Sequence, residues 1–295
     1  MKLEEKANVI YSFSAEQQPV ADLAPGEILV VETADCFNGQ IIESGQELDK
    51  IDFARIRPAT GPFYIAGAEP GDVLEVEILE IKTFERGIMV AGPGFGVLGN
   101  EIKGRMAKVL KLTESNAILA DGLSVPLQPM VGVIGVAPEE GEIGCYYSGP
   151  HGGSLDAKEI RPGSKVYLPV FHSGALLALG GVHALMGDGA ISGAGIEVSA
   201  EVKIQVELVK GATLETPRVE TPEGILFLAS AEKLEEAINA VCRAGVHFLQ
   251  ENYGFSFSEA YMVAGAACHL QICQVVKPLV TVKFFVPRFL QVLHE

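Results

Sequence analysis

The sequence is short of positive charge and has no long apolar run. Lys and Arg together number 22 against 38 Asp and Glu, which gives a formal net charge of −16. A surface with this balance repels phosphate backbones and anionic lipids, so we expect no nucleic-acid or membrane partner. No uninterrupted hydrophobic stretch reaches the roughly 18 residues that cross a bilayer, and the opening segment lacks the apolar core of a signal peptide. We therefore expect a cytoplasmic protein.

Low-complexity tracts and closely paired cysteines are also missing. Hydrophobic residues make up 48% and charged residues 20% of the 295 residues, which is typical of a folded globular chain. The five cysteines are scattered, odd in number, and form no C-x-x-C pair. In a reducing compartment we expect free thiols, buried as small hydrophobic side chains. The role of Cys36 stays open.

Short β-prone runs separated by Gly, Pro, Asn and Asp dominate residues 27–209. In the run DVLEVEILEI, apolar residues alternate with Glu75, Glu77 and Glu80, which predicts a strand with one dry and one wet face. Strands of this kind with turns between them favour an antiparallel sandwich or barrel over a doubly wound parallel sheet.

The C-terminal quarter carries two helical patterns. The segment SAEKLEEAINAVCRAGVHFLQENYG predicts a helix with Ser230 as its N-cap and Gly254 as its stop. Ser256 and Glu259 have capping-box spacing and predict a second helix. The stripe expected to face the core in the first helix consists of Leu234, Ala237, Ile238, Val241, Ala244, Phe248 and Leu249.

Strand-like runs at residues 224–230, 270–276 and 279–287 surround these helices and complete a β-α-α-β-β unit. We predict a mostly β sandwich or barrel region over residues 1–220 and an α+β region over residues 221–295. No Pro/Ser-rich linker separates the two regions, so we expect them to pack as one body.

One glycine motif imitates a nucleotide site. Gly94, Gly96 and Gly99 have G-x-G-x-x-G spacing, but the following segment meets Gly104 within five residues and then has a strand pattern. The dinucleotide fingerprint needs an amphipathic helix at that point. We interpret the segment as a structural glycine loop.

Two other glycine-rich loops carry histidines. His151 lies in SGPHGGSLDAKEI, and His183 and Asp188 lie in LGGVHALMGDGAISGAGIE. Imidazole is the commonest metal ligand, and flanking glycines let bulky ligands from several strands converge. The alternatives are a solvent-exposed turn histidine at His151 and a hydrogen-bonded core residue at His183, beside Val182 and Leu185. If both are functional, the two loops meet at one end of the sandwich.

The segment VVETADCFNGQI places Asp35 beside Cys36. Neighbouring side chains of a strand point to opposite faces, so only one of the two enters a given pocket. A buried carboxylate is costly unless it is paired, which favours Asp35 as the functional residue. The alternative is an aspartate that caps a turn with Asn38 and Gly39. A Cys36 nucleophile would need a base, and no histidine nearby in the sequence supplies one.

Several phrases together resemble the acetamidase/formamidase family. They are TADCFNGQI, ATGPFYIAGAEPGDVLEVEI, GPHGGSLDAKEI, LPVFHSGALLALGGVHALMGDGAISGAGIE and LQICQVV, in the family's order over nearly the whole chain. The resemblance implies a mainly β fold, with a jelly-roll-like β sandwich and a smaller α+β portion near the C-terminus. It also implies a homodimer that hydrolyses the C–N bond of short linear amides such as formamide and acetamide.

The resemblance further implies a site. The family's T-x-D-C aspartate falls on Asp35, its G-x-H-G-G histidine on His151, and its G-D-x-H-A histidine on His183. These three are the candidate ligands of a divalent metal, Zn²⁺ first and Ca²⁺ as the alternative, whose bound water would attack the amide. The predicted catalytic residues are Asp35, His183 and Asp188. The predicted substrate contacts are Gly152, Gly153 and Met186.

Two acidic positions of the family are replaced in this chain, Asp by Gly181 and Glu by Ala190. Neither replacement can ligate a metal or transfer a proton, and losing an acid–base group commonly costs ~10²–10⁴-fold in rate. One hypothesis is a linear amidase in which His269, Asp188 or Glu197 covers the missing acids. The other is a catalytically weak or inactive family member that acts as a small-molecule binding or structural protein.

Two apolar phrases, FHSGALLALGG and YMVAGAAC, fit either the core or a subunit contact. Burial inside the monomer is the favoured interpretation.

Overall fold

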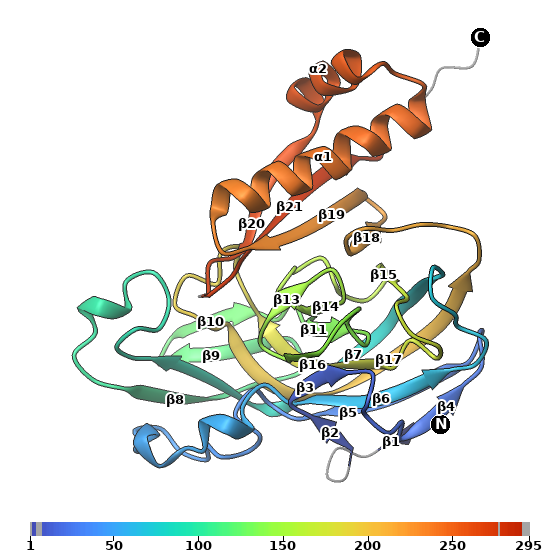
Figure 1. The fold of residues 1–295 in the computed structure, drawn as a ribbon. Coiled ribbons are helices and arrows are strands. Elements are labelled where there is room, and N and C mark those ends of the chain that lie inside the picture. Colours follow the sequence, from blue (N-terminus) through green and yellow to red (C-terminus); the bar gives the residue numbers. More distant parts are fainter. Residues whose placement is uncertain (1, 4–7, 277, 291–295) are drawn as a thin grey trace.

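Long antiparallel strands form one continuous curled sheet (Figure 1). The protein is seen in a computed structural model that describes residues 2–3, 8–276 and 278–290. The expected mainly β fold with a smaller α+β portion near the C-terminus is confirmed. The main strands are β5 (Ile28–Thr33), β6 (Ala59–Ile65), β7 (Val73–Ala91), β8 (Met106–Lys111), β11 (Met130–Gly135), β15 (Lys165–Pro169), β16 (Leu177–Leu185), β17 (Ile196–Val209), β19 (Gly224–Ala231), β20 (His269–Gln274) and β21 (Val280–Pro287). The shorter strands are β1 (Lys2–Leu3), β2 (Val9–Ile10), β3 (Ser12–Ser14), β4 (Ala21–Leu23), β9 (Asn116–Ala120), β10 (Leu123–Pro126), β12 (Glu142–Gly144), β13 (Ser148–Gly149), β14 (Gly152–Ser154) and β18 (Arg218–Thr221).

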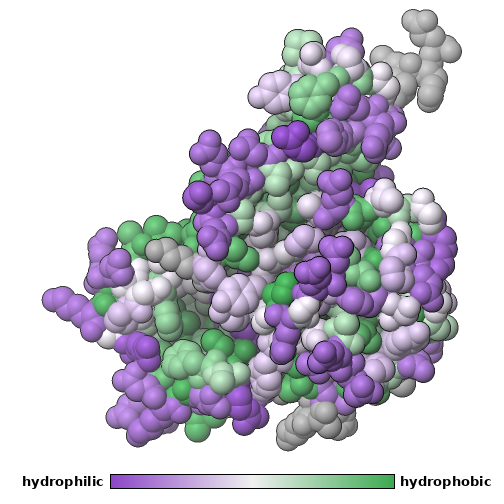
Figure 2. Space-filling view, viewed as in Figure 1, coloured by the Kyte–Doolittle hydropathy of each residue, from purple (hydrophilic) through white to green (hydrophobic). Residues whose placement is uncertain are grey.

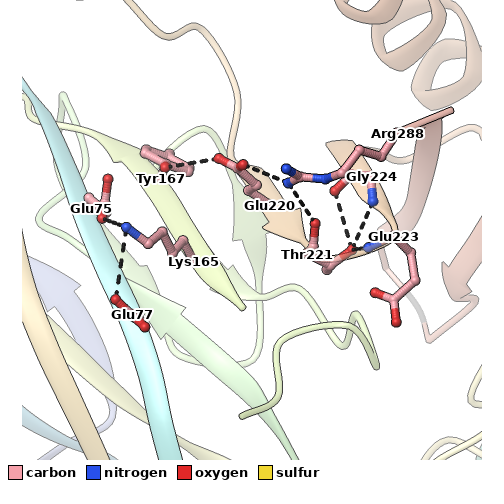
Figure 3. Close-up of polar contacts among 9 residues, drawn as sticks. All are labelled: Glu75, Glu77, Lys165, Tyr167, Glu220, Thr221, Glu223, Gly224 and Arg288. Carbon is pink, nitrogen blue, oxygen red and sulfur yellow. Dashed lines mark hydrogen bonds and ion pairs between the residues drawn. The ribbon is translucent and has the colours of Figure 1, made fainter. Parts of the chain in front are cut away.

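The two longest strands, β7 and β17, pair antiparallel along most of their length. The alternation predicted for β7 is confirmed: Val76 and Ile78 are fully buried, whereas the intervening glutamates face polar neighbours. Lys165 of β15 lies 2.6 Å from Glu75 and 3.8 Å from Glu77 (Figure 3). The glutamates therefore tie β7 to β15 on the face away from the core.

The same polar network continues toward the C-terminal strands. The Tyr167 hydroxyl donates to Glu220 of β18 at 3.2 Å, and Arg288 donates to the other oxygen of Glu220 at 2.9 Å (Figure 3). Because β18 pairs with β15 and with β19, the sheet runs without a break from the main body into the C-terminal unit. The predicted boundary between residues 220 and 221 falls inside β18, and the division into two regions stays a prediction.

Two helices lie over β19 and β21 at the top of Figure 1, α1 (Leu234–Tyr253) and α2 (Phe257–Ala267). The predicted capping box of α2 is present, and α1 ends at Gly254 with the expected left-handed backbone, φ +71°. The N-cap predicted at Ser230 is wrong. Ser230 belongs to β19, where its hydroxyl shares a hydrogen bond with Thr281, and Lys233 precedes α1 without a side-chain cap. Pairing with β21 extends β19 past the residue that looked like a cap.

No helix among the described residues is long and apolar enough to cross a membrane. All five cysteines are free, and Cys36, Cys145 and Cys273 are buried. The other two, Cys242 and Cys268, are only partly buried, so the prediction of buried thiols is correct for three of the five cysteines.

The contact between α1 and β21 depends on a glycine. A Cβ placed on Gly245 would lie 2.2 Å from Cδ1 of Phe284, which is itself buried. In α2, by contrast, a Cβ on Gly265 would meet nothing within 4 Å. Gly245 thus lets the helix approach the sheet closely.

We expect Gly245→Ala to lower the free energy of unfolding by about 1–3 kcal/mol because the methyl group overpacks the contact with Phe284. The matched change Gly265→Ala should raise it by up to about 1 kcal/mol, since alanine favours the helix and has room. Urea unfolding of both variants checks this pair, and equal effects of the two changes would contradict it.

Candidate active site

A buried histidine–carboxylate pair joins strands β16 and β17. The register of the two strands places His183 opposite Glu197, and His183 Nε2 lies 2.9 Å from Glu197 Oε1. The two residues are 5% and 2% exposed. Burial alone would lower the pKa of His183, but the Glu197 carboxylate outweighs burial and holds that pKa above its ordinary value. The pair can therefore carry a proton inside the protein.

A small polar cavity of about 10 Å³ adjoins this pair and has room for one water molecule. Arg57, Ser154 and Asp156 line it beside the pair. Arg57 Nη1 donates to Ser154 Oγ at 3.2 Å, and that hydroxyl donates to Asp156 Oδ2 at 2.7 Å. The remaining Asp156 oxygen, Oδ1, is not used by this hydrogen bond. We call this cavity the inner pocket.

Close approach in the inner pocket depends on Gly132 of β11. A Cβ at Gly132 would lie 2.6 Å from Asp156 Oδ1 and 2.8 Å from His183 Cε1. Any larger residue would therefore separate the carboxylate from the imidazole.

Unusual backbone conformations gather around the inner pocket. Arg57, Asp156 and Ala190 line it and have φ of +54°, +48° and +41°. Such conformations cost about 1–3 kcal/mol each for non-glycine residues and cluster at functional sites. Their position supports the inner pocket as the candidate functional site.

Asp35 does not line the inner pocket, whereas its neighbour Cys36 does. The Asp35 carboxylate accepts hydrogen bonds from the backbone N–H groups of Phe37 and Gly39 and lies 3.8 Å from Arg86. Burial raises its pKa, although these hydrogen bonds act against the rise. The structure thus places Asp35 as a turn cap, the alternative that the sequence left open.

Cys36 faces the inner pocket as a neutral thiol. Its side chain is buried, and burial raises its pKa, as does the Glu197 carboxylate. A thiolate nucleophile is therefore not supported here.

His151 lies between β13 and β14 and is 1% exposed, so it is not a solvent-exposed turn residue. Its ring stands edge-on to Phe13, with 5.3 Å between the ring centroids. Neither ring nitrogen has a hydrogen-bond partner, and burial lowers its pKa to about 4. His151 is absent from the residues that line the inner pocket, so the two histidine loops do not present both imidazoles to that cavity.

Asp188 is held by two lysines outside the inner pocket. Lys283 of β21, whose side chain is fully buried, lies 2.6 Å from one Asp188 oxygen, and Lys158 lies 2.5 Å from the other. Burial would raise the pKa of Asp188, but the two lysines outweigh it and lower that pKa. Lys283 also bonds Glu159 at 2.8 Å. These contacts fix the loop that follows β16 and continues into Ala190.

Of the three predicted substrate contacts, one lines the inner pocket and two do not. Met186 lines the inner pocket. At Gly152 and Gly153 a Cβ would lie 2.2 Å from Ile134 O and 2.0 Å from Tyr147 O, so both positions are close backbone crossings. They are not among the residues that line the inner pocket.

The replaced acidic positions fall in the inner pocket itself. Gly181 and Ala190 both line it, beside His183 and Glu197. Glu197, one of the residues expected to cover the missing acids, is thus in place. His269 is not: it is exposed at the start of β20 and stacks on Phe285.

The predicted ligand set does not fit a metal in this structure. Among residues 2–3, 8–276 and 278–290, no group of three His, Cys, Asp or Glu side chains is placed to hold an ion. Asp35 already accepts backbone hydrogen bonds, His183 is paired with Glu197, and His151 packs on Phe13.

Sequence reasoning missed three residues of the inner pocket, Arg57, Ser154 and Asp156. Arg57 lies just before β6, and its backbone N–H donates to Cys36 O at 2.6 Å. Its side chain also reaches Gly193 O at 3.4 Å. The only signal for Arg57 in the sequence was its place two residues before the family-like phrase that begins ATGPF, since nothing local indicates a half-buried guanidinium.

The fold is a mainly antiparallel sheet, and its candidate site is a buried imidazole–carboxylate pair beside a one-water cavity. The model of the acetamidase/formamidase family matches residues 3–142 and 148–290, and the chain belongs to this family.

Similar solved structures and a curated relative agree with this membership. The crystal structure of an acetamidase from Bacillus halodurans is 41% identical, with a TM-score of 0.95 and 97% of each chain covered. That of a predicted acetamidase/formamidase from Thermoanaerobacter tengcongensis is 41% identical, with a TM-score of 0.93, over 96% of this chain and 94% of the other. A putative formamidase from Schizosaccharomyces pombe is 29% identical over 63% of this chain and 60% of its own length. The match thus spans less than two thirds of that yeast protein.

We expect His151 to make the protein acid-sensitive. Its pKa is about 4 in the folded chain against an ordinary 6.5, so the unfolded chain binds the proton first. Stability is then complete above pH 6.5 and falls by on the order of 3 kcal/mol as the pH drops from 6.5 to 4. His151→Leu removes this titration, so unfolding free energies measured across that window should fall less steeply than in the wild type. Identical slopes for the two proteins would contradict the assignment.

Proposed function

We propose that this protein hydrolyses the C–N bond of linear amides in the inner pocket. The observation that carries the proposal is the buried His183–Glu197 pair beside a cavity of one-water size. Membership of the acetamidase/formamidase family supports the same reaction class. The activity, the substrate and the partners of this chain are all parts of the proposal.

Amide hydrolysis needs a base for the attacking water, a donor for the oxyanion and an acid for the departing amine. Asp156 Oδ1 accepts a proton from the attacking water while the water oxygen bonds to the carbonyl carbon of the amide. The Arg57 guanidinium, fixed by Ser154 and Gly193 O, donates to the developing oxyanion. His183 passes a proton to the nitrogen as the C–N bond breaks. Glu197 stabilises the charged imidazole and keeps its orientation.

The metal-activated water implied by the family resemblance is a separate element of the proposal. Asp35, His151 and His183 give it no support as a ligand set, for the reasons given above. Measuring Zn²⁺ and Ca²⁺ in the purified protein beside the activity assay tests it directly.

A homodimer in the cytoplasm completes the proposal. Of the two apolar phrases, FHSGALLALGG is mostly buried, with Ala178 and Leu179 fully inaccessible. In YMVAGAAC, by contrast, Tyr261 and Met262 of α2 are 64% and 66% exposed. This exposed face of α2 supports a contact with a second copy.

We expect Glu197→Gln to lower kcat for formamide and acetamide by about 10²–10⁴-fold, because the neutral amide no longer holds a proton on His183. Glu207→Gln, on the same strand but exposed, is the matched control and should leave kcat unchanged. Ammonia release measures both. Wild-type rates in the Glu197 variant would remove the pair from the mechanism.

An inactive or weakly active family member is the second candidate function. It is favoured by one observation: Gly181 and Ala190 leave the inner pocket without two acidic side chains that the family has there. Such a protein would keep the cavity for binding a small molecule.

Placing acidic side chains at positions 181 and 190 tests this alternative. A Cβ at Gly181, where φ is +55°, would lie 2.7 Å from Cγ2 of Val133. We therefore expect Gly181→Asp with Ala190→Glu to need Val133→Ala as well. If the wild type is inactive, the triple variant should release ammonia from acetamide, whereas Val133→Ala alone should not. An active wild type would reject the second candidate.

A further inference from the structure

A second, larger cavity of about 460 Å³ adjoins the inner pocket, and we call it the outer cavity. The two cavities share their neck, so a molecule in the outer cavity reaches the inner pocket. The residues that line both are Cys36, Arg57, Gly193, Ala194 and Val276.

The wall of the outer cavity is largely apolar. Phe37, Phe53, Ile56, Val90 and Phe95 contribute to it together with Tyr11 and Tyr146, and among the residues that the structure describes Arg57 at the neck is the only charged one in the lining. Hydrophobic side chains gather at the lower left of Figure 2, over the segments near residues 40–55 and 90–105 seen in Figure 1. Beyond the neck the cavity therefore offers an acyl group mainly apolar contact, with Tyr11 and Tyr146 as the polar side chains beside it.

The sizes of the two cavities orient a substrate. The inner pocket, at about 10 Å³, is too small for an acyl chain or for a substituent on the amide nitrogen. The outer cavity, at about 460 Å³, lies in the range that holds drug-sized ligands, and the single methyl group of acetamide would leave it nearly empty. With the carbonyl at Arg57, the unsubstituted NH₂ must point inward and the acyl group outward.

We propose that the substrates are primary amides with a bulky apolar acyl group, such as an arylacetyl or medium-length acyl chain, and that the outer cavity binds this group. The assignment rests on the proposed amide hydrolysis in the inner pocket. The bond cleaved is the C–N bond: water supplies OH to the acyl carbon and a proton to the nitrogen, which leaves as ammonia.

The substrate series acetamide, butanamide, hexanamide and phenylacetamide tests the proposal in the wild-type protein. Burying each methylene against an apolar wall should raise kcat/KM by about threefold to fourfold. N-Methylphenylacetamide should fall about a hundredfold below phenylacetamide, since its methyl group does not fit the inner pocket. A flat series, or N-methyl amides accepted equally, overturns the proposal while leaving amide hydrolysis intact.

Ala54→Trp fills the outer cavity from an exposed position on its rim, so the fold tolerates the change. It should lower kcat/KM for phenylacetamide at least tenfold more than for acetamide. Ala120→Trp, exposed at the end of β9 and outside the cavity lining, is the matched control and should change neither value. Equal losses for both substrates in the Ala54 variant overturn the assignment of the outer cavity.

Absence of turnover with every amide would contradict the proposed function, and binding then decides the present inference separately. Calorimetry with phenylacetamide should show binding to the wild type and to Ala120→Trp, and at least tenfold weaker binding to Ala54→Trp. No binding to the wild type would overturn the inference as well.

Discussion

The register between β16 and β17 is the constraint on which the site depends. It sets His183 directly across from Glu197, so the carboxylate raises the pKa of the imidazole and holds the ring in one orientation although both residues are buried. A shift of one residue would turn one of the two side chains to the opposite face of the sheet. The irregularity between His183 and Leu185 shows that the strands bend at this point, where the chain leaves β16 for the loop that carries Met186 and Ala190.

The narrow inner pocket and the wide, largely apolar outer cavity meet at one neck. The two cavities therefore offer a bound molecule different contacts. Charge and hydrogen bonds concentrate where there is room for a single water, so the low dielectric of the interior strengthens them. Apolar residues line the part where a substrate would gain most from leaving water. The neck residues Arg57 and Ala194 belong to both parts, and the proposed mechanism puts the reacting carbonyl there.

Local patterns were readable from the sequence, and contacts between distant segments were not. The alternation of Glu75 and Glu77 with apolar residues predicted a strand because a side-chain period of two is a local property. The capping box at Ser256 is local in the same way. Ser230 misled the prediction because β19 continues as far as its partner strand allows, which no local signal reveals.

For the candidate site, too, the sequence predicted local features and missed contacts between distant segments. The sequence located the histidine loops and the two replaced acids, and the geometry brings His183, Gly181 and Ala190 to one cavity. The sequence favoured Asp35 over Cys36, whereas the turn after β5 brings Cys36 and not Asp35 to the inner pocket. Arg57 escaped notice since its partners lie 97 and 136 residues away along the chain.

Lys283 gives the molecule an order of assembly. Its buried ammonium group bonds Asp188, 95 residues earlier, and Asp188 lies in the loop that bears four lining residues of the inner pocket, Met186, Ala190, Gly193 and Ala194. During synthesis that loop leaves the ribosome long before its buried cation is made. The ion pair that holds this loop can therefore form only after β21 has docked on the sheet.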